Sequence, residues 1–186
     1  MKYKPNYKFG LLDYIKDENI SLADIDTSAI IDMSYLFENS SRKNFEGIET
    51  WNVSNVSDMK CMFKNAQYFN ADLSFWNVYK VLDMSEMFSN AKCFNCDLTS
   101  WNIDNLKYFD DIFENADSFK HTKTILKFYN KCKNRNYKKK LQSMLETLDI
   151  KELYTELTND KIHYKKNKDF IKKIENVYYD DIRDLI

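Results

Sequence analysis

The sequence is poor in the two residues that most often force turns. Its 186 residues include only two glycines and one proline, so few turns can depend on the special backbone conformations of those residues. Hydrophobic residues make up 44% of the chain and aromatic residues 16%, a composition that excludes an intrinsically disordered protein. We therefore expect a chain that is ordered almost throughout and long enough to bury a real core.

Long hydrophobic runs are also absent from the sequence. The first 20 residues lack the apolar segment of a secretory signal, and no stretch of about 18 apolar residues occurs anywhere. We expect a cytoplasmic protein with no membrane insertion, since a surface or secreted location would require a leader preceding these residues. In the cytoplasm the four cysteines are expected to be reduced thiols.

Neither sign of charge dominates the whole chain, but each dominates one part of it. The formal net charge is -1. Residues 121–186 contain 16 lysines and arginines against 10 acidic residues, whereas residues 1–120 contain 12 against 19. The two regions, at +6 and -7, are electrostatically different and are expected to serve different purposes.

What the sequence does contain is a repeat of 25 residues. Tryptophan begins each of the segments WNVSNVSDMKCMF, WNVYKVLDMSEMF and WNIDNLKYFDDIF, at Trp51, Trp76 and Trp101. A degenerate copy precedes them at a spacing of 26, which gives four copies between about residue 20 and residue 120. Because a unit this short cannot bury its own hydrophobic face, the copies are expected to stack on one another.

The apolar spacing within one copy changes from a strand period to a helical period. Trp76 and Val78 are separated by one residue, which places both side chains on one face of a strand. Met84, Met87 and Phe88 follow at i, i+3 and i+4, which is the spacing of one helix face. Each copy therefore predicts a short strand followed by a short helix, with the strands on the concave side of the stack.

The repeat also resembles that of a known family. The spacing Leu73-x-x-Trp76-x-Val78 and the segment FNADLSFWNVYKVLDMSEMF are similar to the repeats of BspA-like leucine-rich-repeat proteins. The resemblance implies a right-handed repeat fold and a role in binding other proteins. We predict an α/β repeat protein, a short right-handed leucine-rich-repeat-like solenoid of about four coils with one short parallel strand and one short helix per coil.

From His121 onward the hydrophobic period is helical throughout. Helices are predicted near residues 125–132, 141–148, 150–157 and 170–178. An exposed solenoid end needs a cap, so an all-helical C-terminal cap is the expected role of this region. The predicted organisation is a capping segment at 1–20, the repeat solenoid at 21–120, and a basic helical region at 121–186 packed on the solenoid end.

A basic cluster gives the C-terminal region a second interpretation. Nine lysines and arginines, and no acidic residue, lie between Ser118 and Leu145 with tyrosines interleaved. Such a patch suits contact with RNA or with an acidic protein, whereas a merely solvated pair of helix faces would have the same composition. The candidate contacts are Lys131, Lys133, Arg135, Tyr137, Lys138, Lys139 and Lys140.

Catalytic and metal-binding patterns are largely missing. Cys93-x-x-Cys96 has the spacing of half a zinc site, but no second half exists in the sequence. Asp58, Asp72, Asp83 and Asp97 recur with the repeat, which favours a structural role in turns over acid-base catalysis. We predict no enzyme, no metal and no cofactor.

The exposed face of the predicted strands is the remaining candidate site. Asparagines at one repeat position are expected to form a polar ladder, surrounded by side chains that differ from coil to coil. The candidate partner-binding residues are Thr50, Asn52, Ser54, Phe75, Asn77, Tyr79, Ser100, Asn102 and Asp104. Alternatively, the face has no partner and its asparagines simply hydrogen-bond to one another along the stack.

Two functions remain open at this point. The first is a non-catalytic protein-binding module that uses this exposed face. The second is a small intracellular effector or inhibitor, of mobile-element or phage origin, that engages RNA or a ribonucleoprotein such as a host-defence nuclease through the basic C-terminal helices. The oligomeric state is left open by the sequence.

Overall fold

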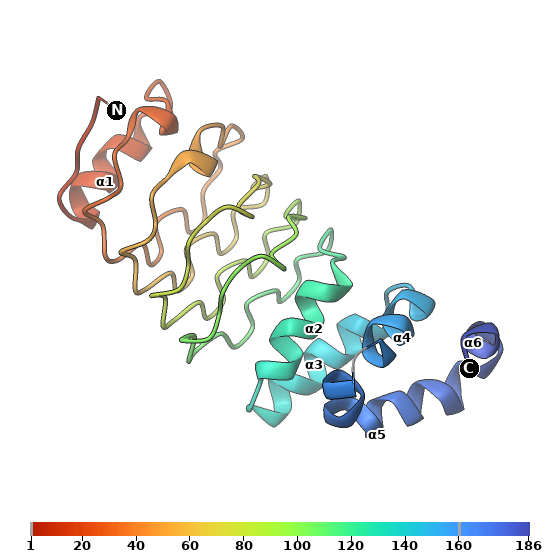
Figure 1. The fold of residues 1–186 in the computed structure, drawn as a ribbon. Coiled ribbons are helices and arrows are strands. Elements are labelled where there is room, and N and C mark those ends of the chain that lie inside the picture. Colours follow the sequence, from red (N-terminus) through yellow and green to blue (C-terminus); the bar gives the residue numbers. More distant parts are fainter. Residues whose placement is uncertain (1, 160) are drawn as a thin grey trace. The chain divides into compact units, whose positions relative to one another are not determined.

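The repeats and the C-terminal helices form two separate units, Met1–Phe119 and Lys120–Ile186 (Figure 1). The computed structural model describes residues 2–159 and 161–186, without the side chains of 161–163. The packing of the second unit on the end of the first stays a prediction, and each unit is described by itself.

A short helix precedes the repeats. Helix α1 spans Lys8–Lys16 and buries Leu11 and Ile15. The Nη1 atom of buried Arg42 donates a hydrogen bond to the Ile15 carbonyl at 3.0 Å, which ties the end of α1 to a later loop. Two single-turn 3₁₀ helices, η1 at Leu22–Asp24 and η2 at Ile48–Thr50, begin the first two coils.

The predicted parallel strands are wrong. Within residues 2–159 and 161–186 the backbone forms no β-strand, only isolated parallel bridges such as Asp58↔Asp83. Trp76 and Val78 are buried and Asn77 between them is exposed, as the period-two pattern predicted. That alternation needs only three residues of extended backbone, so it does not require the hydrogen-bonded ladder that defines a sheet. The leucine-rich-repeat solenoid inferred from it is therefore corrected to a stack of turns.

The predicted short helix of each coil is also wrong. Around Met59, Met62 and Phe63 the chain forms successive turns, in which the N–H of Met62 donates to the Met59 carbonyl and that of Ala66 to the Phe63 carbonyl. A helix would use all its amides within the same segment. Here every second N–H donates instead to the next coil.

These donations between coils follow a strict alternation. The N–H groups of residues 59, 61, 63 and 65 donate to the carbonyls of residues 83, 85, 87 and 89 at 2.8–2.9 Å. Residues 33–39 and 84–90 repeat the pattern toward the coil that follows each of them. This alternation alone gives four hydrogen bonds between neighbouring coils, which are drawn from orange to green in Figure 1.

The turns place residues other than glycine at positive φ. Cys61 has φ 54° and Asn65 has φ 59°, and the equivalent residues of the other coils lie between 55° and 58°. A type II turn requires positive φ at its third residue. In the turns Met59–Met62 and Phe63–Ala66, the third residues are Cys61 and Asn65. Asparagine tolerates this conformation better than most residues, and it occupies one of the two positions in all four coils.

Phenylalanines fill the centre of the first unit in two parallel rows. Phe37, Phe63, Phe88 and Phe113 stack along the array at 5.5–6.1 Å between ring centroids, with planes within 5° of parallel. A second row, Phe69, Phe94 and Phe119, continues at 5.4–5.7 Å. Within each coil the two rows also contact each other, since the ring centroids of Phe88 and Phe94 lie 3.9 Å apart.

The tryptophans connect each coil to the preceding one. The indole Nε1 of Trp51 donates to the Leu22 carbonyl at 2.8 Å, and that of Trp76 donates to the Ile48 carbonyl at 3.2 Å. Trp101 makes the same bond to Leu73 at 2.8 Å. A buried indole N–H needs a hydrogen-bond acceptor. The tryptophan row therefore both fills the core and donates hydrogen bonds to backbone carbonyls of the preceding coil.

The second unit is helical where the sequence predicted helices. Its elements are α2 (Thr122–Lys131), α3 (Arg135–Glu146), α4 (Ile150–Thr158), α5 (Lys161–Val177), α6 (Tyr179–Ile182) and the 3₁₀ turn η3 (Arg183–Leu185). The side chains of Asn134 and Asp149 cap the starts of α3 and α4. No helix in the described part of the chain is long and apolar enough to cross a membrane.

Candidate functional site

The nine predicted face residues lie at the surface of the first unit. Ser54 is half-buried and the others are exposed, with the Phe75 side chain 88% accessible and that of Tyr79 49% accessible. Thr50, Phe75 and Ser100 occupy the same position in consecutive coils. The Ser100 hydroxyl donates to the Ser74 carbonyl at 2.5 Å, so this part of the face is held in place by a bond between coils.

Asn52, Asn77 and Asn102 form an exposed polar row as predicted, but the alternative in which they hydrogen-bond to one another along the stack is wrong. Asn52, Asn77 and Asn102 do not bond to one another, because each side-chain oxygen accepts from the backbone N–H two residues later, at 3.0–3.2 Å. These are Asx turns. The asparagines of this row therefore stabilise the turn within their own coil.

A neighbouring row makes the bonds between coils that the asparagines were expected to make. Asn55 donates to the Ser28 carbonyl at 2.9 Å, and Asn105 donates to the Tyr79 carbonyl at 2.9 Å. Between them, the Lys80 ammonium donates to the Asn55 oxygen at 2.8 Å. These three residues lie at one repeat position, so the sequence itself contains the periodicity of the row that bonds between coils.

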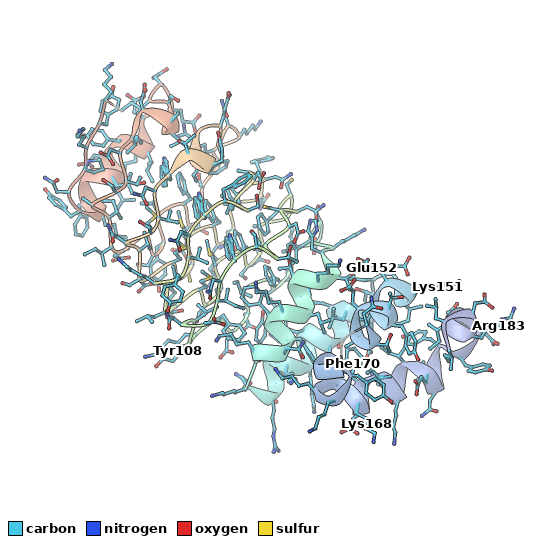
Figure 2. The ribbon with its side chains drawn as sticks, viewed as in Figure 1. Tyr108, Lys151, Glu152, Lys168, Phe170 and Arg183 are labelled. Carbon is cyan, nitrogen blue, oxygen red and sulfur yellow. The ribbon has the colours of Figure 1, made fainter. Side chains whose placement is uncertain are left out.

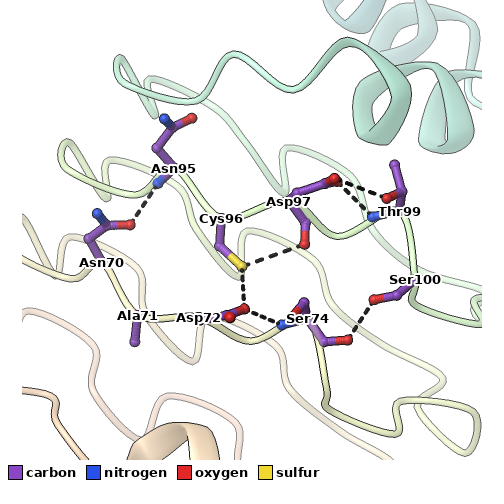
Figure 3. A pocket seen from close by; sticks show the side chains of 9 residues that line it. All are labelled: Asn70, Ala71, Asp72, Ser74, Asn95, Cys96, Asp97, Thr99 and Ser100. Carbon is purple, nitrogen blue, oxygen red and sulfur yellow. Dashed lines mark hydrogen bonds between the residues drawn. The ribbon is translucent and has the colours of Figure 1, made fainter.

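An open hollow of about 580 Å³ lies close to Phe75 along the chain (Figure 3). Asp72 and Asp97 occupy the same position in two consecutive coils, and each accepts a 2.9 Å hydrogen bond from the amide two residues later. Hydrogen bonds from the Ser74 hydroxyl and amide lower the pKa of Asp72. The predicted structural role of these aspartates in turns is confirmed, and it leaves the hollow acidic.

Cys96 lies at the base of the hollow with its side chain buried. Its Sγ lies 3.6 Å from Asp72 Oδ1 and accepts a hydrogen bond from the Leu73 amide at 3.2 Å. Burial raises the pKa of this thiol to about 11, which disfavours the reactive thiolate. Cys93, by contrast, is exposed. No cluster of three or more histidine, cysteine or acidic side chains suited to a metal occurs among the described residues.

The cysteines should therefore differ in reactivity. In the folded protein at pH 8, we expect iodoacetamide to alkylate Cys93 and to leave Cys96 unmodified, because Cys96 is both buried and protonated. The rate at Cys96 should rise about tenfold per pH unit until the pH approaches 11, provided that the fold persists. Both cysteines lie on the tryptic peptide 93–107, so fragmentation of that peptide in tandem mass spectrometry measures both rates, and equal labelling at pH 8 would contradict the prediction.

The basic helices present fewer contacts than the sequence suggested. Tyr137 is only 3% exposed and packs in the core of the second unit, so its predicted stacking on bases is wrong. Lys133, Arg135, Lys139 and Lys140 are exposed, while Lys131 and Lys138 are half-buried. The Lys138 ammonium lies 4.4 Å from the ring centre of Tyr129. Farther along the unit, Lys168 projects outward from α5 (Figure 2).

The site that the geometry assembles is an exposed surface of the first unit. It offers exposed aromatic rings, hydroxyls and an acidic hollow, and the carboxylates in it are already engaged with backbone amides. No histidine or lysine is among the residues that line the hollow, and the Ser74 hydroxyl is hydrogen-bonded to the Asp72 carboxylate.

Comparison with known proteins finds a matching family. Neither a curated protein nor a solved structure matches the chain. A family described as "Mycoplasma protein of unknown function, DUF285" matches residues 9–128, which cover α1, the four coils and the first part of α2. That match says nothing specific about BspA-like repeats, so this resemblance stays a prediction. Because the match covers well over half of the sequence, the chain belongs to the family of Mycoplasma proteins of unknown function, DUF285.

Proposed function

We propose that this protein is a non-catalytic protein-binding module, and that the face around Phe75 and Tyr79 contacts the partner. The observation that supports it best is the 88% exposure of Phe75 on a backbone that bonds between coils hold in place. Exposed aromatic side chains on a rigid frame are the usual anchors of protein interfaces. The acidic hollow nearby adds specificity for a partner with basic side chains.

Replacing Phe75 and Tyr79 together with alanine should weaken binding by at least about tenfold, because these rings supply most of the apolar area that the face offers. The measurement is affinity capture with the purified protein, from cells in which it occurs, followed by quantitative mass spectrometry. Tyr108→Ala is the matched control, since that tyrosine is 61% exposed at another repeat position (Figure 2).

The control variant should retain the captured proteins, and nuclease treatment should not release them. If the double variant captures the same proteins in the same amounts, the face is not the binding site. If nuclease releases the partner, and alanine at Lys133, Arg135 and Lys139 also abolishes capture, the second candidate is favoured. Exposure of these three basic side chains on the second unit is the observation that keeps RNA or ribonucleoprotein binding open.

A further inference from the structure

A second apolar surface lies on the first unit, where the chain enters α1. Tyr7, Phe9 and Ile31 are 64%, 74% and 62% exposed, and they line one open groove of about 390 Å³. Three large apolar side chains left in water around one hollow are unusual for an isolated protein. Neither the proposed binding face nor the core of the unit uses them. We refer to this surface as the Phe9 groove.

The charges of the Phe9 groove are balanced within it. Lys8 Nζ lies 3.3 Å from Asp32 Oδ1 and donates to the Ser34 hydroxyl at 2.6 Å. The Asp32 side chain remains 51% exposed beside this contact. A partner of strong positive or negative charge would find no surplus of the opposite charge here, although the unit as a whole is acidic.

One positive and one negative group side by side form a self-complementary pattern. A two-fold rotation of a second copy places its Asp32 toward Lys8 of the first copy and its Lys8 toward Asp32, while the apolar rings meet between them. Two-fold contacts use the same patch on both molecules, so complementarity of a patch to itself is the requirement for such a contact. The groove meets that requirement in both its apolar area and its charge.

We propose that the Phe9 groove is a dimer interface that is filled by the same groove of a second copy of this chain. Tyr7, Phe9 and Ile31 supply the apolar centre, and Lys8 and Asp32 fix the two-fold register across it. The proposed binding face around Phe75 lies at other repeat positions, so the dimer presents that face twice. Two weak contacts with a multivalent partner would then act together.

The first experiment measures molar mass by size-exclusion chromatography with light scattering. The wild-type chain should approach twice its monomer mass of 22.4 kDa as concentration rises. The Phe9→Glu/Ile31→Glu variant should remain monomeric, with dimerisation weakened by at least about 100-fold because buried charges would face each other. Phe75→Glu is the matched control at a similarly exposed phenylalanine, and it should dimerise like the wild type. A wild type that stays monomeric, or a double variant that still dimerises, overturns the proposal.

A charge-exchange experiment tests the two-fold register independently of folding. Lys8→Glu gives a groove with two acidic groups and Asp32→Lys a groove with two basic groups, so each variant alone should dimerise at least about tenfold more weakly than the wild type. An equimolar mixture should regain dimer mass, because unlike grooves then face each other. Recovery in the mixture also shows that both variants are folded. A mixture that stays monomeric, while the wild type dimerises, overturns the assigned register.

Discussion

Replacing Phe88 with alanine is expected to lower the free energy of unfolding by about 3–5 kcal/mol. The ring is fully buried and lies between Phe63 and Phe113 along the stack, at 5.8 Å and 6.1 Å. It also touches Phe94 at 3.9 Å within its own coil. Removing it opens a cavity that these neighbours cannot fill, since each ring is itself held by the next coil.

Urea denaturation followed by circular dichroism measures this loss. Phe75→Ala removes the same ring from an 88% exposed position in the same coil, and it should change stability by no more than about 0.5 kcal/mol. The difference between the two variants isolates burial from the change in side chain. If both lose the same amount of stability, the assignment of the phenylalanine rows to the core is wrong.

Gly47→Ala is expected to destabilise the protein by about 2–5 kcal/mol. Gly47 has φ +94°, and a Cβ atom on it would lie 2.4 Å from the backbone nitrogen of Ala23 and 2.8 Å from its Cβ. Both the backbone conformation and the close approach of two coils therefore require glycine at this position. Neither neighbouring atom belongs to the end of a flexible side chain, so relief requires a shift of the backbone.

The other glycine of the chain provides the matched control. Gly10 lies within α1, and a Cβ there would meet Pro5 Cβ at an ordinary 3.5 Å. Gly10→Ala should therefore stabilise the protein by about 0.5–1 kcal/mol, because alanine is the better helix former. Thermal unfolding of both variants should shift in opposite directions, and two shifts of the same sign would contradict this account of the coils.

Burial in the first unit could be predicted from the sequence, but the backbone conformation could not. Trp76, Val78, Met84, Met87 and Phe88 are all buried, as their periodic positions indicated. Spacing at i, i+3 and i+4 is produced equally by a helix and by successive turns, since both advance the chain in similar steps. Only the destination of the amide hydrogen bonds distinguishes the two, and that destination lies in another coil.

The positive φ angles of the turns could be predicted from the sequence at only one of the two positions in each coil. Asparagine tolerates the left-handed conformation better than most residues, and it recurs at residues 39, 65, 90 and 115, all of which have positive φ. The other position in each coil is Tyr35, Cys61, Glu86 or Asp111, and these residues have no common preference for that conformation. The neighbouring coils impose it through their hydrogen bonds.

Tyr137 was wrongly predicted to contact RNA, although its burial could be predicted from the sequence. Tyr137, Leu141 and Leu145 follow one another at intervals of four, which is one face of α3, and all three are buried. Tyrosine was assigned to base stacking because of its lysine neighbours rather than its helical position. The exposed Lys139 lies outside that interval, so the same pattern separates it from the core.

The alternation of amide donors separates the shape of a coil from its attachment to the next coil. One set of amides closes turns within a coil, and the other set forms the same pattern of hydrogen bonds to the neighbouring coil at each step. Because the junctions are alike, a whole coil can be gained or lost without altering the bonding of the coils that remain. Array length is therefore free to vary during the evolution of such proteins, while the spacing and orientation of the exposed side chains stay constant.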